Sequence, residues 1–186
     1  MSPLKSCREN YLIPTVVRSA DTKKKWYVFF LCPRAEKIVH KDLTNRGYEV
    51  FLPIKQLVRE WRNRQRKMVQ VPLFPNYIFV YTRAHELYHI KCLPKVATYV
   101  SWSGKPATIA EPEIEGIRRM LSLEQEVTVE SRFYRGARVR VIEGLLAGHE
   151  GILVRRAGKS RFGIQLNAIN QTVFVDISIA ALEEIK

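Results

Sequence analysis

Residues 71–81 read Val-Pro-Leu-Phe-Pro-Asn-Tyr-Ile-Phe-Val-Tyr, an unusually apolar and aromatic stretch interrupted by two prolines. The prolines fix the direction of the chain, and the alternation from Asn76 to Tyr81 predicts a β-strand. Successive side chains of a strand face opposite sides of its sheet. Either both faces are buried, or one face packs on helices while the other presents aromatic side chains outward. An exposed aromatic surface would imply a protein partner, and the residues alone favour neither arrangement.

Strands and helices alternate on both sides of this stretch. Apolar residues with helical spacing, or runs rich in aromatic and β-branched residues, predict strands at 26–31, 48–54 and 96–102 and helices at 34–46, 84–92 and 111–123. We therefore expect a first domain at 25–124, with its strands in one antiparallel sheet flanked by the helices, preceded by a tail at 1–24.

The pattern changes after a linker predicted at 125–132. The remaining residues, 133–186, contain four short apolar runs separated by glycine, asparagine or charged turns: 137–142, 150–155, 162–166 and 172–177. Short strands with turn signals between them are typical of a small β-barrel. The predicted fold class is therefore α+β with a separate C-terminal barrel.

The charge of the chain points to a polyanionic partner. Its 31 basic and 18 acidic residues give a net charge of +13, and residues 23–110 alone carry 17 basic and 5 acidic residues. The longest apolar run, Trp26–Cys32, is far shorter than a membrane-spanning helix, and no signal peptide is recognisable. The three cysteines are far apart and form no CxxC pair, so we expect buried thiols in a reducing cytoplasm.

Residues 55–70 predict a basic β-hairpin. The segment holds six basic residues and one acid. Guanidinium groups on a protruding hairpin suit phosphate contacts, and Trp61 within it could stack on a base. The alternative is a solvated hairpin whose arginines only keep the surface soluble. In so basic a domain we favour nucleic-acid binding.

One five-residue pattern suggests an enzyme. His85-Glu86-Leu87-Tyr88-His89 matches HExxH, in which two histidines on one helix face hold zinc and the glutamate acts as a general base. The predicted helix is short, however, and acids that could supply a third ligand, such as Glu113, lie at a helix start where acids are expected anyway. We therefore interpret the pattern as a solvated helix with two surface histidines, and expect no metal.

A glycine-punctuated block opens the second domain. Residues 135–152 read Arg-Gly-Ala-Arg-Val-Arg-Val-Ile-Glu-Gly-Leu-Leu-Ala-Gly-His-Glu-Gly-Ile, and no GK[ST] follows, so this is not a phosphate-binding loop. The block resembles a KOW motif. Pro72–Val80, with Trp26-Tyr27 ahead of it, resembles the signature of the NusG N-terminal domain. Asn76 stands where general elongation factors of this family have glycine, which is more similar to the specialised, operon-specific RfaH-like branch.

The resemblance implies a transcription elongation and antitermination factor rather than an enzyme, with neither catalytic residues nor cofactor. The N-terminal domain of the family binds the clamp helices of the largest RNA polymerase subunit through an aromatic cavity, which suppresses pausing and termination. Carried over to this chain, the cavity would contain Phe30, Phe51, Phe74, Tyr77 and Phe79, and the aromatic face would be exposed. We also expect a cytoplasmic monomer, and the lack of a recognisable basic amphipathic helix with a strong apolar face argues against binding to a membrane surface.

Two further contacts follow from the resemblance. Non-template DNA would meet the first helix, the loop before the last strand and the basic hairpin, through Arg34, Lys37, Lys41, Arg59, Arg62, Arg64, Arg66 and Lys95. The KOW barrel would recruit a ribosomal protein or the terminator Rho through Phe162, Ile164 and Leu166. The main alternative is a KOW-containing, RNA-binding protein associated with the ribosome, although such proteins lack the N-terminal signature.

Overall fold

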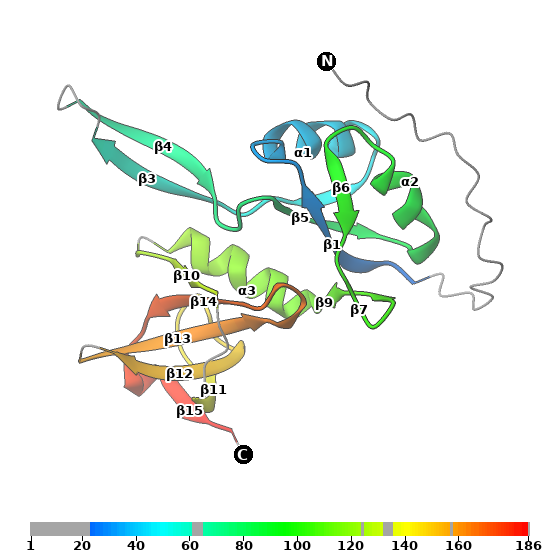
Figure 1. Cartoon of the computed structure of the whole chain (residues 1–186). Helices are drawn as coiled ribbons and strands as arrows, with labels where there is room; N and C mark the ends of the chain where they lie inside the picture. Colours follow the sequence, from blue (N-terminus) through cyan, green and yellow to red (C-terminus); the bar gives the residue numbers. More distant parts are fainter. Residues whose placement is uncertain (1–22, 61–64, 124, 132–135, 157, 186) are drawn as a thin grey trace.

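The first domain is built on a five-stranded antiparallel sheet (Figure 1). The computed structural model describes residues 23–60, 65–123, 125–131, 136–156 and 158–185. The strands run in the order β2-β5-β1-β6, and β9 pairs with the beginning of β1. Their bounds are β1 (Lys25–Leu31), β2 (Glu49–Phe51), β5 (Tyr77–Thr82), β6 (Val96–Tyr99) and β9 (Thr108–Ile109).

Three helices cover this sheet, on opposite faces. α1 (Glu36–Asn45) and α2 (Leu87–Lys91), the latter preceded by the 3-10 turn η1 (Ala84–Glu86), pack their apolar side chains against Tyr27 and Phe29 of β1. α3 (Glu111–Ser122) packs against the other face, with Trp26 and Val28. The alternation along β1 thus supplies both cores, because neighbouring side chains of a strand point in opposite directions.

Two hairpins leave the sheet. β3 (Ile54–Glu60) and β4 (Arg66–Pro72) pair only with each other and project away from the body of the domain (Figure 1). β7 (Ser101–Trp102) and β8 (Lys105–Pro106) form a much shorter hairpin. Its turn residues Ser103 and Gly104 have φ values of 48° and 77°, the positive values that a two-residue type I′ turn requires.

The second domain is a six-stranded antiparallel sheet forming the small barrel that the sequence predicts. Its strand order is β10-β14-β13-β12-β11-β15. The elements are β10 (Thr128–Glu130), β11 (Ala137–Val141), β12 (Glu150–Arg156), β13 (Lys159–Leu166), η2 (Asn167–Ile169), β14 (Gln171–Asp176), η3 (Ile179–Ala181) and β15 (Leu182–Glu184).

The segment predicted as a linker includes a strand of this barrel. β10 lies within residues 125–132 and pairs with β14. Arg161 of β13 fixes it in place: its guanidinium lies 3.1 Å from the Glu130 carboxylate, donates to the hydroxyl of Thr128 and stacks 4.7 Å from the ring centre of Phe174. A three-residue strand carries too little periodicity to be distinguished from a loop in the sequence, since its stability comes from these distant partners.

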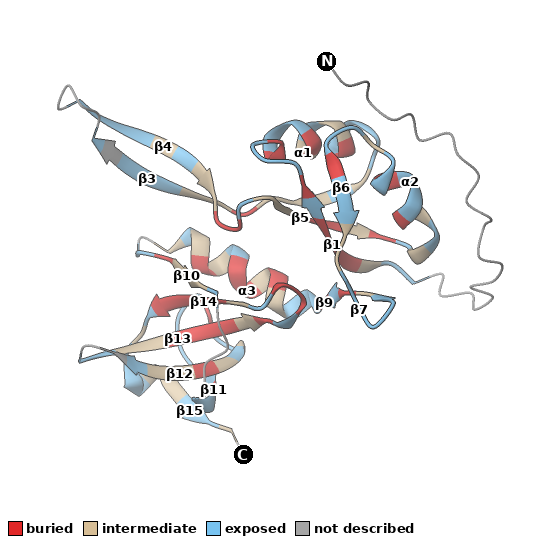
Figure 2. Ribbon diagram, in the orientation of Figure 1, coloured by how far each residue is buried: buried red, intermediate tan, exposed pale blue. Residues whose placement is uncertain are grey.

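The two domains share one hydrophobic core. Buried side chains from β1, β5 and α3 form a continuous cluster with those of β11, β13 and β14, and buried positions face one another across the domain boundary (Figure 2). The helices of the described residues are all too short or too polar to cross a membrane.

Candidate functional site

The aromatic residues expected to contact a partner lie on one face of the N-terminal sheet. Phe51 of β2 and Phe79 of β5 have ring centres 6.0 Å apart, and Phe74 packs edge-on against Phe79 at 5.6 Å. Phe30 and Tyr77 form a separate T-shaped pair at 5.3 Å, where β1 ends and β5 begins. The structure therefore brings all five predicted residues to the face opposite α1 and α2.

α3 covers one end of this aromatic face. Trp26 donates its indole N–H to Glu111 at 2.5 Å, and the guanidinium of Arg118 lies 5.6 Å from the Trp26 ring and 5.2 Å from the Phe51 ring. Arg118 also forms an ion pair with Glu49 at 3.6 Å. These contacts add to the burial of Ile114 and Ile117, which are fully inaccessible to solvent.

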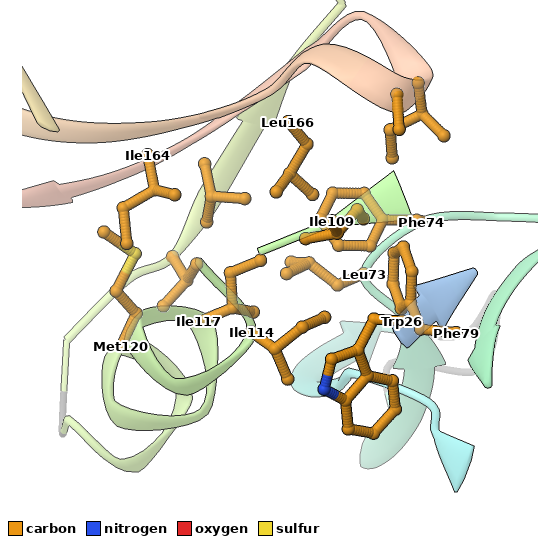
Figure 3. Packing of buried hydrophobic residues seen from close by; sticks show 14 of the residues in the cluster. Trp26, Leu73, Phe74, Phe79, Ile109, Ile114, Ile117, Met120, Ile164 and Leu166 are labelled. Carbon is orange, nitrogen blue, oxygen red and sulfur yellow. The ribbon is translucent and has the colours of Figure 1, made fainter. Parts of the chain in front are cut away.

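The barrel docks on the other side of α3. A Cβ atom at Gly116 would lie 2.4 Å from Ile164 Cδ1 and 2.9 Å from the His149 ring, so only glycine allows this close approach. Arg119 donates to the Leu145 carbonyl at 3.1 Å, and Trp102 donates its indole N–H to the Ala168 carbonyl at 3.2 Å. Figure 3 shows Ile164 and Leu166 pointing from the barrel toward α3 and Phe74.

This docking corrects the expectation of an open aromatic face. Phe74 and Phe79 are fully buried in the shared core, because α3 and the barrel lie over them. We call Trp26, Phe51, Phe74 and Phe79 the covered end of the face. Phe30, which is 37% exposed, and the half-buried Tyr77 form its open end.

Three loops converge beside the open end, and each contains one left-handed residue that is not glycine. Arg34, Asn76 and Lys95 have φ values of 62°, 65° and 69°. Asparagine adopts this conformation more readily than most residues, so Asn76 meets the backbone requirement of this turn without glycine. Arginine and lysine have no such advantage, and each such residue costs about 1–3 kcal/mol, which the contacts of its surroundings must offset.

Backbone hydrogen bonds join the three loops. Leu31 donates its N–H to the Asn76 carbonyl at 2.7 Å, and Cys32 donates to the Lys95 carbonyl at 2.9 Å. The Asn76 N–H donates to the buried Glu36 carboxylate at 2.9 Å. Two of the predicted nucleic-acid residues, Arg34 and Lys95, are thus held at one end of the sheet.

The exposed side of α1 extends this basic surface. Lys37 and Lys41 are exposed along one side of the helix, one turn apart, and Ile38 between them is 54% exposed. The structure therefore brings together Arg34, Lys37, Lys41 and Lys95 as one region, which we call the loop-end basic surface.

The projecting hairpin has two different faces. Cross-strand partners share a face, so Val58 and Met68, which are 64% and 69% exposed, form an apolar pair on one face. Their neighbours there, Glu60 and Arg66, form an ion pair at 3.4 Å. Lys55 and Lys67 belong to the opposite face by register. Arg59 pairs with Lys67 along the backbone, and Arg62 and Arg64 lie outside the described residues.

The residues predicted to bind partners of the barrel are buried. Phe162 and Leu166 are fully inaccessible and Ile164 is 3% exposed. Ile164 contacts α3 at Gly116, so the domain interface occupies part of the surface that the sequence assigns to another protein.

Glu86, the glutamate of the HExxH pattern, has a structural role. Glu86 accepts hydrogen bonds from the Thr82 hydroxyl at 2.6 Å and the Arg83 N–H at 3.0 Å. These bonds, led by that from Thr82, lower the pKa of the Glu86 carboxyl. Across the described ranges, no three His, Cys, Asp or Glu side chains are grouped to hold a metal ion.

Comparisons with known proteins agree with the fold. A family model described as "Transcription termination factor nusG" matches residues 24–118. Transcription termination/antitermination protein NusG of Pseudomonas aeruginosa is 27% identical over 176 residues, covering 87% of this chain and 99% of that protein. NusG of Halalkalibacterium halodurans is 24% identical over 178 residues, covering 88% of this chain and 99% of that protein.

A solved structure, "Domain interaction in Thermotoga maritima NusG", is 22% identical, with a TM-score of 0.47; it covers 89% of this chain and 99% of that one. The family model spans just over half of the sequence and coincides with the N-terminal sheet and its helices. The chain therefore belongs to the NusG family of transcription termination and antitermination factors.

Proposed function

We propose that this chain is an elongation and antitermination factor of the specialised, operon-specific type, which binds the clamp helices of RNA polymerase through its aromatic face. The observation that carries the proposal is the open Phe30–Tyr77 pair, whose rings meet at 5.3 Å on a face otherwise lined by aromatic side chains. Exposed aromatic side chains are typical anchors of protein interfaces, because they lose little conformational entropy on binding.

Binding the whole face requires the barrel to move. Phe74 and Phe79 are buried beneath α3 and the barrel, while the open end is already accessible. A partner that first contacts Phe30 and Tyr77 can gain further area only by competing with Ile164 and Leu166. Polymerase binding then acts by favouring one polymerase conformation over another, so no bond is made or broken by the factor.

The basic surfaces contact nucleic acid in this proposal. Arg34, Lys37, Lys41 and Lys95 would meet the non-template strand beside the polymerase-binding face, and the β3–β4 hairpin would meet DNA further away. Affinity for DNA alone should fall with salt, with a log–log slope on the order of −4 to −6 if that many phosphates are neutralised. An affinity that does not change with salt would contradict this part of the proposal.

The barrel recruits a further factor, a ribosomal protein or Rho, once it leaves α3. Ile164 and Leu166 lie at the domain interface, so recruitment through β13 and polymerase binding through the covered end both require the same separation. Phe162 would support β13 from inside the barrel.

The test is binding to purified bacterial core RNA polymerase. Phe30→Asp and Tyr77→Ala should each reduce the affinity at least about tenfold, the effect of losing an interface anchor. Tyr88→Ala is the matched control, because Tyr88 is a 68% exposed aromatic residue on α2, across the sheet from the open end. Equal affinities for wild type and both open-end variants would overturn the proposal.

A further inference from the structure

Glu36 is an unusual residue for a basic surface. Among the described residues it is the only charged side chain that is buried, with 7% of its surface exposed. Arg34 and Lys37 lie beside it in the sequence and are both exposed. A buried carboxylate is unfavourable unless it is hydrogen-bonded, so its hydrogen bond should explain its presence.

That hydrogen bond comes from the backbone between two aromatic residues of the proposed polymerase-binding face. The Asn76 N–H donates to Glu36 Oε1 at 2.9 Å, and Tyr77 donates its own N–H to the Phe74 carbonyl at 3.2 Å. Asn76 is in the left-handed region, where a bound N–H keeps the turn in one conformation. Glu36 thus connects the first turn of α1 to the loop before β5.

The same connection continues to the basic residues. The Asn76 carbonyl accepts from Leu31, and the next residue, Cys32, donates to Lys95. Arg34 lies in a turn closed by the Ala35 N–H, which donates to the Cys32 carbonyl at 3.2 Å. Cys32, at the start of that turn, and Glu36, directly after its last residue, are therefore both hydrogen-bonded to neighbouring loops.

We propose that Glu36 is a positioning residue for nucleic-acid binding, which holds Arg34 and Lys95 in register beside the open end of the aromatic face. It contacts no phosphate itself and acts through the Asn76 turn and the end of β1. This inference rests on the proposed nucleic-acid function of the loop-end basic surface. It assigns a role to Glu36, whose negative charge would otherwise only weaken the attraction of that surface for nucleic acid.

The proposal and simple electrostatics predict opposite changes in DNA affinity when the Glu36 side chain is removed. Removing a carboxylate from a basic surface should strengthen the binding of a polyanion if charge alone matters. If Glu36 positions the surface, Glu36→Ala should instead weaken binding of short single-stranded DNA by roughly three- to tenfold, because the Asn76 N–H loses its acceptor. Glu36→Gln keeps an acceptor oxygen, removes the charge, and should bind DNA at least as well as wild type.

A second pair of variants tests the connection from the other side. Asn76→Gly retains the N–H and accepts a φ of 65°, so its DNA affinity should stay within about twofold of wild type. Asn76→Val disfavours the left-handed region and should reproduce the loss caused by Glu36→Ala. The backbone itself is followed by hydrogen exchange of the Asn76 and Cys32 amides in the full chain, with thermal unfolding as the check on overall folding.

The outcomes separate this inference from the proposed function. Faster amide exchange together with weaker DNA binding in Glu36→Ala and Asn76→Val supports a positioning role. Faster exchange with equal or stronger DNA binding, or unchanged exchange in Glu36→Ala, overturns it. If wild type binds no single-stranded DNA at low salt, the nucleic-acid function of the surface fails, and unchanged polymerase binding in that case would leave the aromatic-face proposal standing.

Discussion

The two ends of the aromatic face use the same kind of residue for different purposes. At the covered end, Phe74 and Phe79 are fully buried beneath α3 and the barrel. At the open end, Phe30 and Tyr77 form a T-shaped pair beside three loops with left-handed residues. The covered end should therefore determine stability, and the open end should determine recognition, although both belong to one sheet.

The strongest test of this comparison is aromatic truncation at each end. Phe79→Ala should lower the free energy of unfolding by about 3–5 kcal/mol, because it leaves a cavity in a closed core. Phe30→Ala should cost less than about 1 kcal/mol, since its side chain already contacts solvent. Denaturant unfolding monitored by circular dichroism measures both. Similar losses would mean that the open end also belongs to the core.

The second test separates the barrel from the covered end. Gly116→Leu places a side chain where Ile164 and His149 now approach, so we expect the domains to come apart while each keeps its own fold. Replacing a glycine within a helix also adds about 0.5–1 kcal/mol of intrinsic helix stability, which partly offsets the lost contacts. Small-angle scattering should show an increased radius of gyration.

Ser122→Leu is the control for that variant, because Ser122 is exposed at the end of α3. An unchanged radius of gyration for Gly116→Leu would show that the barrel stays docked even when the new side chain shifts α3. An extended profile with raised polymerase affinity would link the docking directly to access at the covered end.

The third test concerns the left-handed backbone of the open end. Lys95→Gly should change the free energy of unfolding by about 0 to +1 kcal/mol, because glycine adopts a φ of 69° without strain. Lys41→Gly removes the same charge from the middle of α1 and should cost about 1 kcal/mol. Both should weaken DNA binding. A destabilised Lys95→Gly variant would show that the lysine side chain itself supports the loop.

The sequence predicted the parts of this molecule whose signals are local. The alternation of 76–81 and the helical spacing of 34–46 place β5 and α1 to within two residues. β9, β10 and β15 have two or three residues each, and they exist because distant strands pair with them. β2 ends at Phe51, two residues before Pro53, and one predicted strand at 96–102 is divided between β6 and β7.

The placement of the aromatic residues on one face could be predicted, but their burial beneath α3 and the barrel could not. The aromatic side chains could be assigned to one face, whereas the apolar stripe of α3 fits a sheet and a barrel equally well. Gly116 was the available signal, because a glycine within a helix indicates a close approach. Arg34 and Lys95 gave no local sign of a left-handed backbone, since the surrounding hydrogen bonds impose it, and Glu36 was missed because its role depends on the Asn76 N–H.

The smallest expected effect distinguishes two capping glutamates by their pH dependence. Partial burial in the first turn of α3 raises the pKa of Glu113, while its bond from the Ala110 N–H opposes that shift. The hydrogen bonds to the half-buried Glu86 lower its pKa. A raised pKa in the folded state means that Glu113 loses its contribution as the pH rises through that pKa, whereas Glu86 loses its contribution as the pH falls.

Glu113→Gln should therefore raise the free energy of unfolding at neutral pH, by well under about 1 kcal/mol, because the amide keeps the bond from Ala110 without a buried charge. Glu86→Gln should lower it by a comparable amount at neutral pH, and the difference should shrink as the pH falls below the ordinary glutamate range and vanish only below the lowered pKa of Glu86. Denaturant unfolding at neutral and acidic pH measures both differences. If the stability of the two variants changed with pH in the same way, the Glu113 carboxyl at the start of α3 would not be buried in the way that raises its pKa. The contrast between the two ends of the face would then be confined to their aromatic side chains.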